Sequence, residues 1–175
     1  MTPATLVSEE VYLRSSYDPD VDFVDGVLEA RNVGEFDHSD LQTEIARWIR
    51  NNLQRVGLNA FVELRTRVRA SRYRVPDVVI VRGKRPQSGI LETAPLVAIE
   101  ILSPEDRMGR VQQRIDDYLS MGTPFVWVID PETRRAWVHR AGSIEECRDG
   151  NLKAGPPEFV LPLGEVFAAI DAMTE

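Results

Sequence analysis

Two continuous apolar runs in the middle of the chain predict central strands. Residues 77–81 read Asp-Val-Val-Ile-Val, and residues 95–102 read Pro-Leu-Val-Ala-Ile-Glu-Ile-Leu. Runs this rich in branched apolar residues are typical of strands that are buried on both faces. Each run also carries one carboxylate, Asp77 at the start of the first and Glu100 inside the second. A buried carboxylate is costly unless it is paired or binds a metal, so these acids are the first candidates for a functional site.

Alternating apolar and polar residues predict further strands around this centre. Residues 20–31 alternate about an Asp-Gly pair, a strong turn signal, and predict a hairpin. Residues 124–140 predict a second hairpin, with its turn at residues 130–133. Residues 59–70 alternate with period two and predict one long strand. The polar face of that strand carries Glu63, Arg65, Arg67 and Arg69.

Helical periodicity predicts a helix between the first hairpin and the long strand. Apolar residues recur at helical spacing from Leu41 to Val56. Ser39, followed three residues later by Gln42, resembles a capping box, and Gly57 is a stop signal. We expect this helix to pack its apolar face against the central strands.

A second helix is predicted after the Glu100 run. Ser103 is a favourable N-cap, Pro104 suits the first helical position, and Gly122 suits the end. A short helix is expected after the C-terminal segment "EFVLPL". The order of hairpin, helix, strands, helix and hairpin predicts a mixed α/β fold with helices against a sheet.

Length, charge and composition restrict the class of protein. A chain of 175 residues suits one domain and can bury a real core. The net charge of −7 argues against a large basic surface for nucleic acid but is compatible with a local basic cleft. The single Cys147, the lack of a signal-peptide pattern and the lack of a long apolar run favour a cytoplasmic protein with no membrane segment.

The two acids are suitable ligands for one hard cation. Neighbouring strands lie about 5 Å apart, so acids near one edge can share an ion. Mg²⁺ prefers oxygen ligands and usually takes one or two carboxylates, and the carbonyl oxygen of Ile101 is a further candidate. Such an ion can activate water for attack on a phosphodiester. Arg107, Arg110 and Arg114 form a stripe beside the apolar face of the second helix, which suits a phosphate-bearing substrate.

A set of segments that covers most of the chain adds a family resemblance. The segments are "VDGVLEARN", "HSDLQTEIARWI", "VPDVVIV", "PLVAIEILSP", "RIDDYLSMG", "FVWVIDPETRRAWVH" and "FVLPLGEVF". Together they resemble the Uma-type restriction endonuclease family of the PD-(D/E)XK nuclease superfamily. The resemblance implies a single-domain restriction-endonuclease-like fold over residues 1–175, with its core at about residues 20–172. It also implies a mixed central β-sheet flanked by helices, with added N-terminal and C-terminal hairpins.

The resemblance implies a role for each acid. Asp77 matches the metal-binding Asp of the Pro-Asp motif, and Glu100 matches the acid of the (D/E)XK motif. Glu44 lies in the helix where many superfamily members carry a further acid, although a solvated surface acid is an equal alternative. The implied Mg²⁺ (or Mn²⁺) ligands are therefore Asp77, Glu100, Ile101 and Glu44.

The usual lysine of the family is missing. In the resemblance it stands in the second helix, four residues before Tyr118, where this chain has Arg114. The position that an unmoved lysine would occupy is Leu102. An arginine can supply charge and orientation but cannot be deprotonated in practice. Arg114 is thus expected to keep the electrostatic role and to lose any role as a base.

Plainer interpretations accompany these roles. Asp77 could cap a turn. Glu100 could form a buried ion pair with an arginine such as Arg67 or Arg114. His38 is expected to be a capping or surface residue, and Asp106 a capping-box acid for the second helix.

Three functions follow. The leading hypothesis is a metal-dependent DNA endonuclease with Asp77, Glu100 and Arg114 as catalytic residues, and with Arg67, Arg107 and Arg110 on the phosphates. The alternative is a weakened or inactive nuclease fold that binds nucleic acid. The third is a homodimeric interaction module that uses the hairpin of Trp127 and Trp137 and the C-terminal "VFAAIDAM" as apolar surface.

Overall fold

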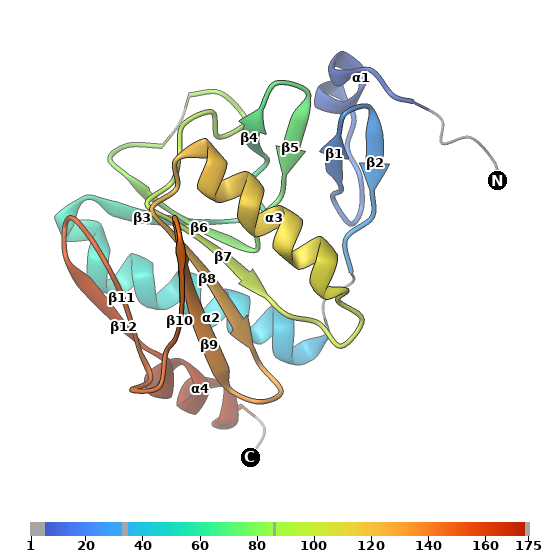
Figure 1. The fold of residues 1–175 in the computed structure, drawn as a ribbon. Helices are drawn as coiled ribbons and strands as arrows, with labels where there is room; N and C mark the ends of the chain where they lie inside the picture. Colours follow the sequence, from blue (N-terminus) through green and yellow to red (C-terminus); the bar gives the residue numbers. More distant parts are fainter. Residues whose placement is uncertain (1–5, 33–34, 86, 174–175) are drawn as a thin grey trace.

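The computed structural model describes residues 6–32, 35–85 and 87–173. Its main sheet contains β3 (Leu58–Val62), β6 (Val78–Arg82), β7 (Val97–Ile101), β8 (Phe125–Asp130), β9 (Arg135–Arg140) and β10 (Ser143–Glu146). The strand order is β10-β9-β8-β7-β6-β3 (Figure 1). Strands β7 and β8 are parallel, and the other neighbours are antiparallel. The mixed α/β fold with a mixed central sheet is therefore confirmed.

Helices cover both faces of this sheet, which explains the two continuous apolar runs. The helices are α2 (Phe36–Leu53), α3 (Met108–Met121) and α4 (Leu163–Asp171). Figure 1 shows α3 across the front of the sheet and α2 behind it. Alternate strand residues such as Ile99 and Trp127 pack in the core cluster of α2 and α4, while Ala98 and Val128 pack with α3.

A smaller second sheet carries the N-terminal hairpin. Its strands are β1 (Asp22–Val24), β2 (Val27–Glu29), β4 (Thr66–Arg69) and β5 (Arg72–Arg74), in the order β2-β1-β5-β4. Helix α1 (Glu9–Arg14) packs on it through Tyr12, which stacks on Phe23. The hairpin predicted over residues 20–31 is confirmed, but it forms half of a four-stranded sheet. The C-terminal hairpin is β11 (Asn151–Ala154) with β12 (Phe159–Pro162).

The single strand predicted over residues 59–70 is wrong, because the chain turns at Glu63. Glu63 has a positive φ of 48°, and its N–H donates to the Asp77 carbonyl at 3.2 Å. The chain before it pairs with β6 in the main sheet, and the chain after Arg65 pairs with β5 in the second sheet. The alternating pattern continues through this turn, so period alone could not reveal it.

Both predicted helix starts also differ from the structure. Helix α2 begins at Phe36, three residues before Ser39, and its N-cap is Glu35. A short 3-10 segment, η1 (Gln54–Val56), follows it, and Gly57 ends the helical stretch at φ 79° as predicted. We infer that the N-cap preference of Ser39 is outweighed by the packing of the whole helix face.

Helix α3 begins at Met108, five residues after Ser103. The Asp106 N–H donates to the Ser103 carbonyl at 3.0 Å, and Asp106 Oδ2 accepts the Ser103 N–H at 2.8 Å. These reciprocal bonds close a separate turn, so the capping-box pattern is present without the helix. Gly122 ends α3 at φ 100°, as predicted.

Most of the apolar side chains expected at a dimer surface lie in the core of the monomer, although Trp137 is only partly buried and Met173 is exposed. Trp127 is fully buried, with its ring centroid 5.9 Å from that of Phe159. Val166, Phe167 and Ile170 of α4 are also buried. Separately, none of the helices described has both the length and the apolar character needed to cross a bilayer.

Candidate functional site

Asp77 and Glu100 lie side by side on one face of the main sheet. The antiparallel register of β6 and β7 pairs Val78 with Ile99. The next rung sets Asp77 opposite Glu100, and opposite residues project from the same face. Both acids are buried, and α3 covers this face. The structure therefore brings together the two acids that the apolar runs singled out.

Asp77 is held by three groups from distant parts of the chain. Arg31 Nη2 lies 2.7 Å from Asp77 Oδ1. The Ile101 N–H donates to Oδ2 at 2.7 Å, and His38 Nε2 lies 3.4 Å from the same oxygen. Burial alone would raise the pKa of Asp77, but His38, Arg31 and the Ile101 N–H together lower it below its usual value. Asp77 is therefore ionised.

Glu100 has two partners on α3. The Tyr118 hydroxyl donates to Oε1 at 2.6 Å, and Arg114 Nε lies 2.9 Å from Oε2. Burial, reinforced by the charge of Asp77, raises the pKa of Glu100 to about 7 even though Arg114 and Tyr118 oppose the shift. The interpretation of Glu100 as the partner of a buried arginine is confirmed for Arg114 and wrong for Arg67.

Arg31 and His38 are site residues that the sequence did not reveal. Arg31 follows β2 and reaches Asp77 across 46 positions of sequence, so no local pattern could mark it. Its Nη1 also lies 3.6 Å from Glu63. His38 was expected to cap the helix or face solvent, but it lies within α2 with only 11% of its side chain exposed. Burial lowers the pKa of His38, while its bond to Asp77 raises it more, so the net direction is upward.

Glu44 and Arg67, two other predicted site residues, have partners elsewhere. Arg47, on the same helix, donates to Glu44 from Nε at 2.9 Å. Arg67 lies between Glu9 at 3.6 Å and Glu92 at 3.7 Å, on β4. Within the described part of the chain, neither residue pairs with Asp77 or Glu100. Their assignment to metal and phosphate stays a prediction.

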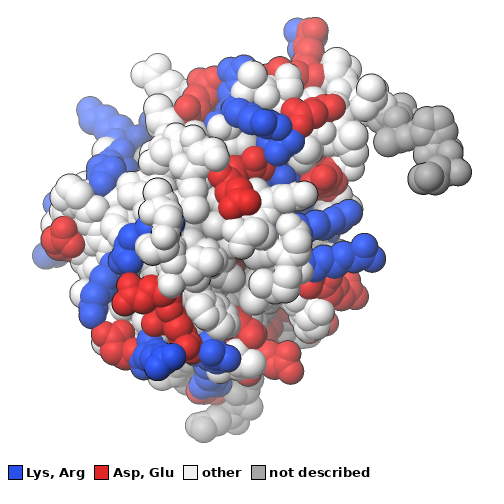
Figure 2. Space-filling model, viewed as in Figure 1, with Lys and Arg blue, Asp and Glu red and all other residues white. Residues whose placement is uncertain are grey.

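The predicted arginine stripe lines one cavity beside the acids. Arg107, Arg110 and Arg114 border a hollow of about 360 Å³, together with Arg74 and Asn32. Acids also border it, namely Asp22, Glu29, Glu105 and Asp106. In the residues that the structure describes, the guanidinium groups of Arg107 and Arg110 have no ion-pair partner. Figure 2 shows acidic and basic side chains interspersed on this side of the molecule, so the free cationic charge is local.

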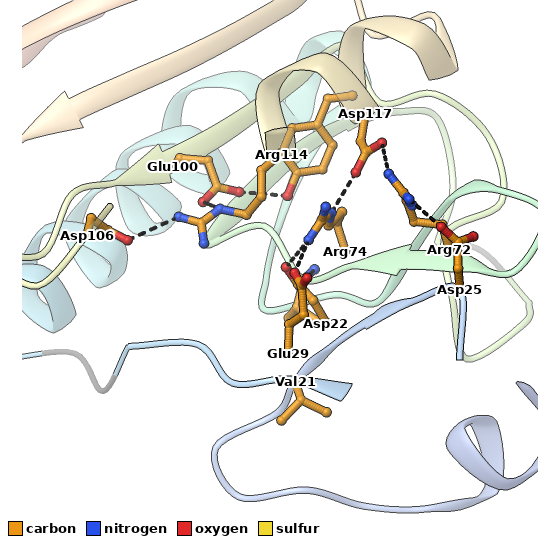
Figure 3. Close-up of polar contacts among 12 residues, drawn as sticks. Val21, Asp22, Asp25, Glu29, Arg72, Arg74, Glu100, Asp106, Arg114 and Asp117 are labelled. Atoms are coloured by element: carbon orange, nitrogen blue, oxygen red, sulfur yellow. Dashed lines mark hydrogen bonds and ion pairs between the residues drawn. The ribbon is translucent and has the colours of Figure 1, made fainter. Parts of the chain in front are cut away.

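A buried arginine joins the second sheet to α3 next to this cavity. Arg74 Nη1 lies 2.9 Å from Asp22 and 3.0 Å from Glu29, while its Nε donates to Asp117 of α3 at 2.7 Å (Figure 3). Arg72 contacts the same Asp117 at 3.1 Å. Because Arg74 is only 2% exposed, this network fixes the orientation of the helix that carries Arg114.

The donor set suits a hard divalent cation better than a soft one. No group of three or more His, Cys, Asp or Glu side chains in the described ranges is arranged to hold a metal. Two carboxylates on one sheet face, with the backbone of Ile101 in contact with Asp77, nevertheless match the small protein share of a typical Mg²⁺ shell. The like charges of Asp77 and Glu100 also require a cation, which arginines supply here. The residues present therefore fit such an ion.

Comparisons with known proteins show the family and the fold of the chain. The family model described as "Uma2: Putative restriction endonuclease" matches residues 9–164. Among solved structures, one described as a "putative nuclease belonging to DUF820" from Anabaena variabilis is similar, with a TM-score of 0.79 and 23% identity. The match covers 93% of this chain and 98% of that one, and it shows a shared fold. Among curated proteins, no significant match was found.

Proposed function

Because this chain belongs to the Uma2 family of restriction endonucleases, we propose that it is a Mg²⁺-dependent endonuclease that hydrolyses phosphodiester bonds in DNA. The observation that carries the proposal is the pair of buried carboxylates, Asp77 directly before β6 and Glu100 opposite it in β7. Arg114, which contacts Glu100, also lines a cavity in which Arg107 and Arg110 have no ion-pair partner among the described residues. Acids for a cation and cations for a phosphate thus lie next to each other.

Asp77, Glu100 and the Ile101 carbonyl would hold the ion, which can be Mg²⁺ or Mn²⁺. When bound, it offsets charge on the phosphate and lowers the pKa of water. Arg107 and Arg110 bind the non-bridging oxygens of the substrate and orient it. Arg114 supplies positive charge where the family usually has lysine, and it does not act as a base.

Plasmid nicking in Mg²⁺ tests this proposal. The isosteric changes Asp77→Asn and Glu100→Gln should each lower the nicking rate by about 100-fold or more, since each removes a charged ligand of the ion. Asp116→Asn is the matched control, because Asp116 lies on the exposed side of α3 and bonds only Gln112 among the described residues. Equal nicking by all four proteins would exclude this site as the source of cleavage.

A non-cleaving nucleic-acid-binding protein is the second candidate function. The observation that favours it is the pairing of both acids with arginines, together with the loss of the family lysine. This candidate predicts duplex binding that weakens steeply as salt rises, with no cleavage in Mg²⁺ or Mn²⁺. Cleavage that is lost in Glu100→Gln would exclude it.

We also propose that the protein acts in the cytoplasm as a homodimer, since cutting both strands of a duplex needs two sites. Several of the apolar side chains first expected at the interface are buried, but the partly buried Trp137 and the exposed Met173 can still contribute to it. Light scattering at micromolar concentration, with and without duplex DNA, tests the assembly. A monomer under both conditions would exclude the dimer.

A further inference from the structure

Arg114 has two carboxylates within reach and contacts them unequally. Its Nε lies 2.9 Å from Glu100 Oε2, and its Nη2 lies 3.4 Å from Asp106 Oδ1. The Nε is buried but makes no hydrogen bond of acceptable angle with Glu100. Figure 3 shows the guanidinium between the two acids. The contact with Glu100 is therefore mainly electrostatic, and a cation of higher charge can replace it.

Asp106 is already fixed in position to accept the arginine. Its Oδ2 accepts the Ser103 N–H at 2.8 Å, and its Oδ1 accepts Asn32 Nδ2 at 3.0 Å. Arg114 Nη2 already donates a long hydrogen bond of 3.4 Å to Asp106 Oδ1, and a shift of roughly 0.6 Å would shorten it to the usual charged length of about 2.8 Å. Arg114 thus has a second partner that requires no rearrangement of the backbone.

Resting on the proposed function, we infer that Arg114 is an internal counter-ion that competes with the divalent cation for Glu100 and moves to Asp106 when that cation binds. When it is bound to Asp106, the Arg114 guanidinium lies in the cavity beside Arg107 and Arg110 and can bind a phosphate oxygen. Binding of the cation and binding of the phosphate are then coupled. The coupling is reciprocal, so a phosphate that binds Arg114 also opens Glu100 to the cation.

Calorimetric titration of the full chain with Mn²⁺, without nucleic acid, tests the competition. It is repeated at several pH values between about 7 and 8.5, because Arg114 lowers the pKa of Glu100 and its loss lets protons compete with Mn²⁺ more strongly. Arg114→Met should bind Mn²⁺ about tenfold more tightly than the wild type, because the competitor is gone. Asp106→Asn should bind about fivefold more weakly, because an amide oxygen accepts a charged donor less strongly. Arg140→Met, which removes an exposed partner of Glu145, is the control and should match the wild type.

The outcomes separate this inference from the proposed function. Equal Mn²⁺ affinity in the wild type and Arg114→Met would overturn the competition and leave the metal site intact. A lack of Mn²⁺ binding in all the proteins would overturn both. If Arg114→Met does not fold, Asp106→Asn decides, since wild-type affinity in that variant would overturn the inference.

A crystal of the wild-type chain soaked in Mn²⁺ gives a second, direct readout. We expect anomalous density between Asp77 and Glu100, with Arg114 about 3 Å from Asp106. Density at that position with Arg114 still on Glu100 would overturn the movement.

Discussion

The raised pKa of Glu100 predicts an unusual loss of stability as the solution becomes neutral. Its pKa is 4.5 for an ordinary glutamate and about 7 in the folded protein, chiefly because the side chain is buried. Between these two values the folded state binds more protons than the unfolded state. The free energy of unfolding must therefore fall as pH rises through this window.

The size of this effect follows from the two pKa values. Each unit of difference corresponds to about 1.4 kcal/mol, so Glu100 contributes a loss of about 3 kcal/mol in total. About 2 kcal/mol of that loss falls between roughly pH 4.5 and 6.5. The other two titrating groups of the site act outside this interval. Asp77 titrates below its usual pKa of 3.8, and His38 titrates above 6.5, where its own contribution is lost as pH rises.

Urea unfolding at several pH values tests the prediction, with Glu100→Gln as the comparison. The variant keeps an oxygen for Tyr118 but cannot titrate. Over this pH interval the wild type should therefore lose about 2 kcal/mol more of its free energy of unfolding than the variant does. Groups that do not interact with Glu100 cancel in the difference. Parallel curves for the two proteins would refute the reasoning and would mean that Arg114 keeps Glu100 ionised throughout.

Two further substitutions test how the rest of the fold supports the site. Arg74→Met should lower the free energy of unfolding by about 3–5 kcal/mol, because it leaves Asp22 buried without its cation. Arg134→Met is the control: it removes an exposed ion pair and should leave the urea midpoint unchanged. Gly122→Ala should cost about 1 kcal/mol from backbone strain at φ 100°, while Gly109→Ala, in α3 with open space around it, should stabilise by about 0.5 kcal/mol in the same assay. A mild effect at Arg74 or a neutral Gly122→Ala would contradict these assignments.

The position of the two acids in the fold was determined by the sequence itself. The apolar runs that contain Asp77 and Glu100 can pair their backbone hydrogen-bonding groups and bury their side chains only as neighbouring strands that are covered on both faces. Helical periodicity likewise set Arg114 on the flank of α3, one turn before Tyr118, and this phase alone directs it toward Glu100. Local periodicity is sufficient to predict which side of a strand or helix a residue lies on, because the buried side of an element selects apolar residues along its whole length.

Only the tertiary structure decided what surrounds the acids. Arg31 and His38 come from segments far from Asp77 in sequence, and both reach it where β6 begins and β7 ends. The turn at Glu63 also depends on the tertiary structure, since β3 and β4 belong to different sheets although one alternating pattern runs through both. Periodicity records which face of an element is buried, but it does not record which partner covers that face. Sequence patterns therefore identified no cation for Asp77, whereas the folded chain places Arg31 beside it from 46 positions away in the sequence.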